Sequence, residues 1–564
     1  MLNFIKRKYD YFIGFTALVA FALLLIENSA YVRPYAFLIG EINLTVTLIF
    51  VSDILLRFFA ARDKKTHLSR NWLDLIVFIP FIQLIRGLEN TAAFVIIRQI
   101  VIILILLSRI RKSTRLLNLL SLKPAQMMIA TFAFAIGVGA VLLMLPVATR
   151  TGVRTSLTDA LFTATSATCV TGLTVKDTAV HFSLFGQIVI LALIQVGGLG
   201  IMTFSVSMAL IMGKNMDMKQ QAVMSDILDE SSLARVKHMV TYILKMTLFC
   251  EAAGAALLFA SWIGRTGGVV KTAYYSVFHA VSAFCNAGFS TFSNNLVRFH
   301  DDVSTNLVIC ALIVVGGLGF TVIKDLHDNL NIRFDFSIRR KVKLKMHTKV
   351  AVLMSAALII LGAAAFYLLE KDALFAGYDL KGRVLSSLFQ SVTARTAGFN
   401  TCSIAGLSGT SLLVMMILMF IGGSPGSTAG GVKTTTVSVL LSTIISEFQG
   451  KDNTEIFRRT ISPALIKKAM IIFSVSSILV VAFAAGLLMV EHKQFLPVVF
   501  ESVSAFGTVG LSADLTQALS GRGKLLITVL MFIGRLGPLT VGYAFLRRHR
   551  QPRYEYAREN LAIG

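Results

Sequence analysis

The twelve residues ESVSAFGTVGLS, from Glu501 to Ser512, decide how this chain is interpreted. Nearly the same residues, HAVSAFCNAGFS, occur earlier, from His279 to Ser290. In both places a short apolar segment ends near a glycine and a polar turn follows. An apolar helix of about a dozen residues is too short to cross a bilayer core of about 30 Å. The pair therefore predicts a repeated re-entrant half-helix, which enters the membrane and turns back.

Four copies of this segment align, each on one glycine, with a one-residue gap in the third copy. They are TSATCVTGLTV on Gly172, VSAFCNAGFST on Gly288, SVTARTAGFNT on Gly398 and VSAFGTVGLSA on Gly510. A second landmark follows each copy at a similar interval. It reads VGGLG at Val196, VGGLG at Val315, IGGSPG at Ile421 and IGRLGP at Ile533. Two landmarks that stay in step through four units indicate an internal repeat.

The composition is that of a membrane protein. The chain has 564 residues, of which 55% are hydrophobic and 15% charged, and its mean hydropathy is +0.74. Long apolar runs predict spanning helices, whereas a β-barrel would show short alternating segments. We therefore expect an all-α polytopic membrane protein. It should hold four helix–pore-loop–helix repeats in a pseudo-fourfold arrangement, preceded by four N-terminal transmembrane helices.

Each repeat is expected to contain a first helix, a short half-helix and a second helix. The first helices are predicted near 125–148, 238–263, 350–369 and 466–490. The half-helices are predicted near 157–169, 272–285, 383–395 and 496–507. The second helices are predicted near 183–212, 304–330, 410–447 and 523–546. The predicted domains are an N-terminal four-helix membrane domain at 1–122, pore repeats at 123–215, 216–335, 336–450 and 451–550, and a cytoplasmic tail at 551–564.

The aligned glycines suit a pathway for a cation. Glycine tolerates backbone angles that let successive carbonyl groups point one way. Four such segments around one axis would offer rings of carbonyl oxygens in place of a cation's water shell, and the half-helices would point their negative ends at the ion. The residues before the glycines have short side chains, which leaves the backbone as the ligand: Thr171, Ala287, Ala397 and Val509. The alternative is that these glycines only permit close helix packing, as most glycines in membrane helices do.

The four units, with VTGLTV, NAGFST, RTAGFNT and GTVGLS, resemble the potassium-translocating subunits of the Trk/Ktr/HKT superfamily over roughly residues 123–550. The resemblance implies that one chain builds a K⁺ pore with one filter glycine per repeat, here Gly172, Gly288, Gly398 and Gly510. Some plant relatives that favour Na⁺ carry serine at the first position, so Gly172 favours K⁺. The alternatives are a Na⁺- or H⁺-coupled cation symporter of the same fold and a Na⁺-permeable variant.

The second helix of the third repeat is interrupted by IGGSPGSTAGGVKTTT, residues 421–436. So many glycines, with a proline, cannot continue a helix. We expect a loop inside the membrane; a surface turn is the alternative, and the short apolar runs on both sides disfavour it. The resemblance implies that this loop forms a gate beneath the filter. The predicted gate residues in the loop are Gly422, Gly423, Ser424, Pro425, Gly426, Gly430 and Gly431.

Arg535 is the remaining predicted gate residue. It stands in IGRLGP, where the other repeats carry Gly198, Gly317 and Gly423. A charge at mid-membrane should face the aqueous axis or a carboxylate, unless its side chain reaches an interface. We expect Arg535 to lie on the axis and to repel cations in the closed state.

Four polar residues occupy equivalent positions in the half-helices: Thr163, His279, Gln390 and Glu501. We expect the first three to tie the half-helices to neighbouring backbone. For Glu501 two roles stay open, a structural one and a supply of negative potential near the filter.

The N-terminal block 1–122 lies outside the repeats. Its stretch FVSDILLRFFAARDKKTHLSRNWLDLIVFIP resembles the second-to-third helix region of voltage-sensor domains, with Asp53, Arg57 and Asp74 at countercharge positions. The next apolar run holds only Arg98, so it would respond weakly to voltage. We expect a degenerate voltage-sensor-like domain with a structural or modulatory role.

The net charge of +24 is spread over short basic loops, which fits the positive-inside rule better than nucleic-acid binding. A multi-pass protein of the bacterial inner membrane is expected, with both termini cytoplasmic. No phosphate-binding loop or catalytic constellation occurs, so we expect no organic cofactor in this chain and no enzyme. The resemblance implies a homodimer docked on a cytoplasmic ring of nucleotide-binding RCK subunits; the alternative is that the basic loops only fix topology and bind membrane lipids.

Overall fold

The computed structural model describes residues 124–200, 233–334 and 344–545, together with the isolated residues Thr45, Leu48 and Ser52. The predictions for the N-terminal block concern Asp53, Arg57, Asp74 and Arg98, which lie outside the described residues. The same holds for the tail 551–564, and for the end of the first repeat and the start of the second between residues 201 and 232.

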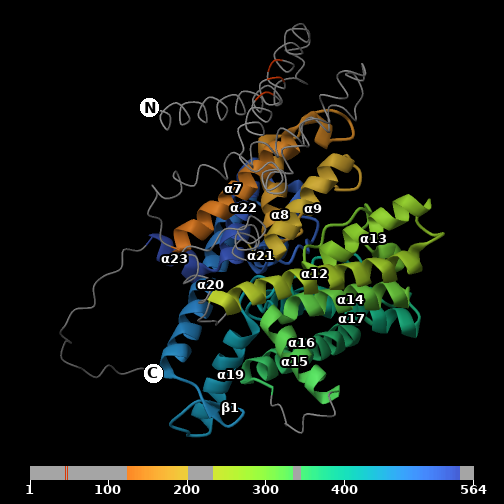
Figure 1. Ribbon diagram of the computed structural model, residues 1–564. Helices are drawn as coiled ribbons and strands as arrows, with labels where there is room; N and C mark the ends of the chain where they lie inside the picture. Colours follow the sequence, from red (N-terminus) through yellow and green to blue (C-terminus); the bar gives the residue numbers. More distant parts are fainter. Residues whose placement is uncertain are drawn as a thin grey trace, which may run out of the picture.

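The described chain is helical, and its elements fall into four successive groups (Figure 1). The first holds α7 (Pro124–Met144), η3 (Pro146–Ala148), α8 (Leu157–Thr168) and α9 (Leu184–Gly198). The second holds α12 (Leu233–Trp262), α13 (Val269–Phe284), η4 (Val297–Phe299), α14 (Val303–Leu318) and α15 (Phe320–Phe334). The third holds α16 (Met346–Glu370), α17 (Leu380–Thr393), α18 (Gly409–Phe420) and α19 (Thr434–Phe448). The fourth holds β1 (Glu455–Ile456), β2 (Arg459–Thr460), α20 (Pro463–Glu491), α21 (Phe495–Gly507), η5 (Thr516–Ala518), α22 (Gly521–Leu536) and α23 (Pro538–Phe545).

Three of the described helices are long and apolar enough to cross a membrane by themselves: Val240–Trp262 within α12, the whole of α16 and the whole of α20. Two further pairs, α14 with α15 and α22 with α23, meet the same criterion only when each bent pair is taken as one span. Large apolar side chains such as Phe249 and Met489 are exposed on the long helices, as expected for surfaces that face lipid.

The four short helices α8, α13, α17 and α21 start at the surface and end in the interior. Polar caps start two of them: Ser156 accepts a hydrogen bond from Asp159 N, and Asp379 accepts one from Gly382 N at 2.7 Å. Their last turns are buried in every case, including the largely polar run from Thr163 to Thr168 of α8. The short helices therefore end inside protein, where an irregular backbone can be tolerated within a membrane.

The second helices differ from the expected continuous segments. α14 and α15 meet at an angle of 100°, and α22 and α23 at 95°. The breaks fall at Gly319 and Gly537, whose φ angles are +96° and +85°. The expected helices 304–330 and 523–546 were thus wrong in shape, because the last glycine of VGGLG and IGRLGP adopts a positive φ that ends a helix.

The first glycine of the same landmark has a different role. A side chain on Gly197, Gly316 or Gly534 would collide with a backbone carbonyl at the end of the short helix of its own group: Thr168, Phe284 and Phe506 respectively. The second helix therefore approaches the short helix so closely that only glycine fits.

The short helices also connect the groups into a closed ring. Each packs against the second helix of the preceding group: α13 against α9, α17 against α14, and α21 against α18. The series closes because α8 of the first group packs against α22 of the last. Lys524 and Asp159 form an ion pair of 2.6 Å at this closure, between residues far apart in the sequence.

Asp159→Asn is expected to destabilise the protein by about 3 kcal/mol, because it leaves the largely buried Lys524 without its countercharge. The thermal unfolding midpoint in detergent measures this loss. Asp372→Asn is the matched control, since Asp372 forms an exposed pair with Lys371 and should contribute almost nothing. An unchanged midpoint for Asp159→Asn, or no recovery when Asp159→Lys is combined with Lys524→Asp, would contradict a role in closing the ring.

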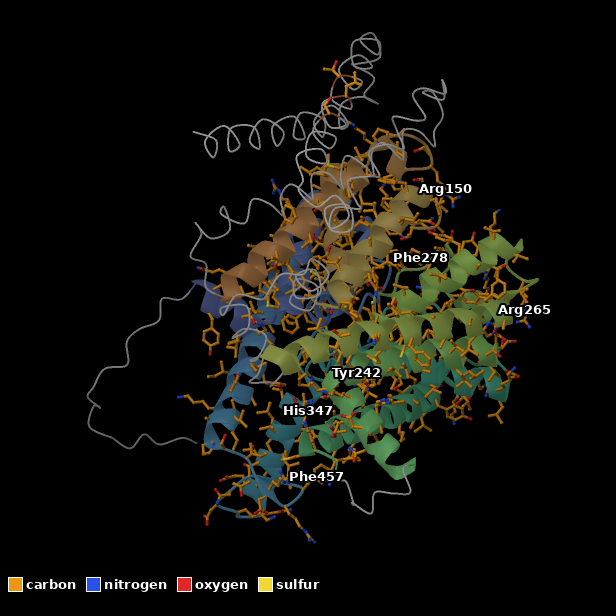
Figure 2. The ribbon with its side chains drawn as sticks, in the orientation of Figure 1. Arg150, Tyr242, Arg265, Phe278, His347 and Phe457 are labelled. Atoms are coloured by element: carbon orange, nitrogen blue, oxygen red, sulfur yellow. The ribbon has the colours of Figure 1, made fainter. Side chains whose placement is uncertain are left out.

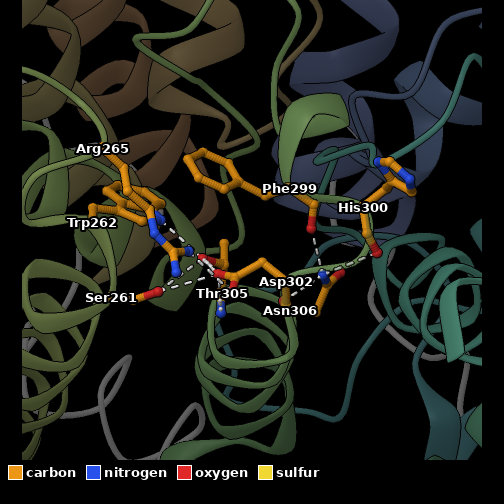
Figure 3. Close-up of polar contacts among 8 residues, drawn as sticks. All are labelled: Ser261, Trp262, Arg265, Phe299, His300, Asp302, Thr305 and Asn306. Atoms are coloured by element: carbon orange, nitrogen blue, oxygen red, sulfur yellow. Dashed lines mark hydrogen bonds and ion pairs between the residues drawn. The ribbon is translucent and has the colours of Figure 1, made fainter.

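A polar cluster joins the end of α12 to the start of α14 (Figure 3). Asp302 caps α14 by accepting from Thr305 N at 3.2 Å, and it also accepts from Ser261 Oγ at 3.1 Å. Burial alone would raise the pKa of the Asp302 carboxyl, but these hydrogen bonds and Arg265 outweigh it and hold the pKa below its usual value. Trp262 donates to Thr305 at 2.8 Å, which fixes the loop before α14 against the long helix.

A small hairpin connects α19 to α20. Glu455 pairs with Thr460 and Ile456 with Arg459 in an antiparallel register. Ile456 and the nearby Ile461 pack on Val350 of α16. In Figure 2, Phe457 of this hairpin lies toward the lower side of the molecule, whereas Arg150 lies at the upper right and Arg265 at the right edge.

Candidate functional site

The four aligned glycines meet in a ring. A side chain built on Gly288 would stand 2.7 Å from Ala397 O, and one on Gly398 would stand 2.5 Å from Val509 O. A side chain on Gly510 would likewise collide with Thr171 O, and one on Gly172 would collide with Ala287 O. The four contacts therefore form a closed circle. Each glycine thus faces the carbonyl that precedes the glycine of a neighbouring group. Another residue would fit only if the backbone shifted, because its Cβ would come within 2.7 Å of that oxygen.

The backbone at the ring has a positive φ at two places in each group. The glycines have φ angles of +91°, +68°, +78° and +92° in chain order. The residues two positions earlier also have positive φ although they carry side chains: Val170, Asn286, Thr396 and Thr508. Such conformations are costly for β-branched residues and persist only where the surroundings impose them. This second position could not be recognised from the sequence, because no glycine marks it.

A hydroxyl from each short helix holds the ring backbone. Ser166 accepts from Gly172 N at 3.1 Å, and Ser504 accepts from Gly510 N at 3.2 Å. In the other two groups the hydroxyl donates to the carbonyl after the glycine: Ser282 to Phe289 O at 2.8 Å, and Thr393 to Phe399 O at 2.5 Å. Sequence reasoning missed these residues, although a hydroxyl recurs six residues before the glycine in three groups and five before it in the gapped third.

The equivalent polar residues of the short helices are held mainly by the loops that follow the glycines. One ring nitrogen of His279 is 2.9 Å from Ser290 Oγ, and Gln390 donates to Cys402 Sγ at 3.2 Å. The other nitrogen of His279 lies 2.8 Å from the backbone oxygen of Tyr275, within the same helix. Among the described residues, Thr163 Oγ1 has no hydrogen-bond partner. Among the described residues, none of the three therefore makes the expected hydrogen bond to backbone outside its own helix, and His279 and Gln390 bind side chains of the following loops instead.

Glu501 is fully buried and both of its oxygens accept hydrogen bonds. Ser512 donates to Oε2 at 2.9 Å, and Thr516 donates to Oε1. Glu501 therefore ties the fourth short helix to the loop that follows its glycine, as its structural role predicts.

A cavity of about 440 Å³ opens on one side of the ring. The four glycines form its floor, together with residues of the loops that follow them. Asp177 and Asp514 lie in its wall, and most of its other lining groups are hydroxyls and amides, such as Ser290 and Asn400. A polar, acidic cavity attracts cations and lets them keep part of their water shell.

The loop 421–433 lies on the other side of the ring. Thr428 Oγ1 donates to Phe284 O at 3.3 Å, at the end of α13, and Gly431 approaches Gly507 at the end of α21. A side chain on Gly430 would collide with Thr508, two residues before the fourth ring glycine. The loop thus covers the inner ends of α13 and α21.

Hydrogen bonds give the loop a defined shape. Gly422 N donates to Val432 O at 2.9 Å, and Ser424 N donates to Gly317 O at 3.0 Å. Gly426, beside Pro425, accepts from Phe320 N at 3.0 Å and has a φ of +69°. These bonds hold the loop against the bend between α14 and α15.

Arg535 reaches this loop from α22. One guanidinium nitrogen donates to Thr428 O, and the other donates to Gly197 O at the end of α9. Within the described ranges no carboxylate forms an ion pair with Arg535. The side chain therefore bridges the loop and α9 beneath the ring through neutral carbonyls, and no ionic partner offsets its positive charge.

Comparison with known proteins places the chain in a family. Residues 92–556 match the family model described as TrkH, cation transport protein. The chain is 39% identical to the Ktr system potassium uptake protein B of Bacillus subtilis over 426 residues, which cover 75% of this chain and 93% of that protein. It is 38% identical to the potassium/sodium uptake protein NtpJ of Enterococcus hirae over 457 residues, which cover 78% of this chain and 98% of that protein.

A solved structure has the same fold. The crystal structure of the potassium transporter TrkH from Vibrio parahaemolyticus superposes with a TM-score of 0.61, covering 95% of this chain and 98% of that chain at 16% sequence identity. The prediction of a helical membrane protein is confirmed, and because the matching family transports cations, so is the prediction that the chain is not an enzyme. The chain belongs to the TrkH family of cation transport proteins.

Proposed function

We propose that this protein takes up K⁺ through the ring of Gly172, Gly288, Gly398 and Gly510. The observation that carries the proposal is the ring itself, in which each glycine faces the carbonyl before its neighbour and a side chain would displace that carbonyl. The names of the relatives in Bacillus subtilis and Enterococcus hirae support K⁺ as the cargo. Backbone oxygens are ligands that suit an alkali ion, because they replace its water without a strong charge.

The filter comprises the four glycines and the residues before them, Thr171, Ala287, Ala397 and Val509. Their backbone carbonyls bind K⁺, and no side chain and no organic cofactor takes part. The positive φ angles two positions before each glycine support this assignment, since alternating conformations turn successive carbonyls toward one direction. The acidic cavity beside the ring is the outer entrance, where Asp177 and Asp514 raise the local cation concentration.

The loop around Gly422, Gly423, Ser424, Pro425, Gly426, Gly430 and Gly431, together with Arg535, forms the gate. Arg535 holds the loop to α9 in the closed state and repels cations that leave the filter. Opening requires that the guanidinium leave Thr428 O or Gly197 O, which frees the loop to move.

The sequence and the family support a membrane arrangement and a set of partners. The chain works as a homodimer in the bacterial inner membrane, with both termini in the cytoplasm, and membrane lipids surround its long helices. An RCK ring subunit binds the basic cytoplasmic loops and opens the gate. The pseudo-fourfold repeats 123–215, 216–335, 336–450 and 451–550 build the pore, and residues 1–122 form a domain with a structural or modulatory role.

A second candidate is a pathway that also admits or requires Na⁺. The name of the Enterococcus hirae relative, a potassium/sodium uptake protein, favours it. A Na⁺- or H⁺-coupled symporter of this fold would change K⁺ flux when the Na⁺ or H⁺ gradient is changed at constant voltage.

Ion flux in proteoliposomes tests the proposed function. Wild-type protein should carry K⁺ and Rb⁺ at least about tenfold faster than Na⁺ at equal driving force, because carbonyl rings of this kind discriminate between alkali ions. Empty liposomes are the control. Equal rates for Na⁺ and K⁺ would favour the Na⁺-permeable variant, and the absence of any cation flux in the presence of a bound regulator would refute the proposal.

A further inference from the structure

Arg395 is a buried cation close to the third ring glycine. It follows α17, only 7% of its surface is exposed, and it stands three residues before Gly398. Its partners are both on Ser355 of α16: Nη1 donates to Ser355 O at 3.3 Å, and Nη2 donates to Ser355 Oγ at 3.1 Å. Its Nε has no hydrogen-bond partner among the described residues.

The charge of Arg395 has no countercharge. In the part of the chain that the structure describes, no Asp or Glu forms an ion pair with it. Its positive charge faces only the carbonyl and hydroxyl of Ser355 and the C-terminal end of α17. The helix dipole makes that end partly negative, which favours a cation. A buried charge without an ionic partner is expensive, so a residue chosen only for packing would not be an arginine.

The position of Arg395 in its group places it at the inner end of the ring. The corresponding residues, three before their glycines, are Cys169, Cys285 and Gly507. A side chain on Gly198 would collide with Cys285, and Gly507 lies against Gly431 of the loop 421–433. These positions therefore sit beneath the ring, on the side of the loop and away from the acidic cavity.

We propose that Arg395 weakens cation binding at the inner end of the filter, so that K⁺ leaves it quickly toward the gate. The proposal rests on the proposed K⁺ pathway through the four glycines. The half-helices point their negative ends at the ion, and Arg395 cancels that contribution for one of the four. Conduction needs binding that is strong enough for entry and weak enough for exit, and a fixed positive charge beside the inner end serves the exit.

The charge of the bound ion provides the test. A unit charge roughly 10 Å from the ion changes the affinity for K⁺ about tenfold at an effective dielectric constant near 20, and the affinity for a divalent ion by the square of that factor, about 100-fold. Ba²⁺ is nearly the size of K⁺, so carbonyl oxygens spaced for K⁺ can also coordinate it. Removal of the charge by Arg395→Gln should therefore raise the affinity for both ions, and the affinity for Ba²⁺ far more than that for K⁺.

The experiment measures binding of KCl, RbCl and BaCl₂ to the purified full-length protein by calorimetry, with the thermal midpoint as a check of folding. Arg395→Lys keeps the charge and should bind as the wild type does. Ser355→Ala removes one neutral acceptor but keeps the charge, and it should also leave the affinities unchanged. If Arg395→Gln cannot be purified, Ser355→Asp neutralises the charge of Arg395 in place. It should also raise the affinity for Ba²⁺ more than the affinity for K⁺.

The outcomes separate the proposal from the function on which it rests. If Arg395→Gln changes the affinities for Ba²⁺ and K⁺ by equal factors, or lowers both affinities, the residue only shapes the filter and the proposal is wrong. If the wild-type protein itself binds neither K⁺ nor Ba²⁺, and Gly398→Ser makes no difference, the proposed K⁺ pathway fails together with it.

Discussion

Arg535→Ala is expected to raise K⁺ leak about tenfold or more in protein that has no activating partner bound. Two effects act in the same direction. Loss of a unit charge about 10 Å from a passing ion lowers the barrier by roughly 1.7 kcal/mol at an effective dielectric constant near 20. Loss of the hydrogen bonds to Thr428 O and Gly197 O also frees the loop 421–433 from α9. Rb⁺ uptake into K⁺-loaded proteoliposomes measures the leak.

Arg535→Lys separates the two effects. Lysine keeps the charge but cannot bridge both carbonyls with a planar fork, so we expect a leak between those of the wild type and Arg535→Ala. Arg522→Ala is the matched control, because Arg522 is an exposed arginine at the other end of the same helix, α22. A leak in Arg535→Ala no larger than in Arg522→Ala would show that Arg535 does not close the pathway.

Gly172→Ser and Gly398→Ser are expected to lower the preference for K⁺ over Na⁺ at least about tenfold. A side chain at either position displaces a carbonyl of the neighbouring group, Ala287 O for Gly172 and Val509 O for Gly398. Both glycines also have positive φ, so the backbone around the new residue must shift. The ratio of Rb⁺ to Na⁺ flux in proteoliposomes measures the change.

Gly152→Ser provides the control for backbone strain. Gly152 also has a positive φ, of +69°, but nothing lies within 4 Å of the position of a Cβ. It therefore carries the conformational cost of about 1 kcal/mol without a collision. Selectivity should be unchanged in Gly152→Ser, and the ring is not a filter if Gly172→Ser is equally selective.

What could be predicted from the sequence depends on neighbours in the chain. The length of an apolar run limits whether a helix can span a membrane, so the short helices were recognisable near 157–169 and 496–507. A position that needs a positive φ, such as Gly172, is visible as a glycine. The landmark VGGLG was also recognised, but the structural roles of its glycines were not predicted. Its first glycine leaves room for a backbone carbonyl of the short helix, and its last glycine, Gly319, ends the helix.

Other features of the site had no signature in the sequence. Val170 and Thr508 have positive φ only because the surrounding ring imposes it, and their residue types would argue against it. Arg395 was visible merely as part of a gapped copy of the repeat. The role of Glu501 stayed open between two possibilities, because only the folded chain brings Ser512 and Thr516 to its carboxylate.

The sequence by itself determined the class of the protein, its repeats and the four glycines, since these follow from hydropathy, period and the backbone freedom of single residues. Only the tertiary structure decided which carbonyl each glycine faces, and that Arg535 bridges Thr428 and Gly197. Those contacts join residues from different groups of the chain. Their partners are selected by how helices pack around the ring, and no local pattern of residues encodes that choice.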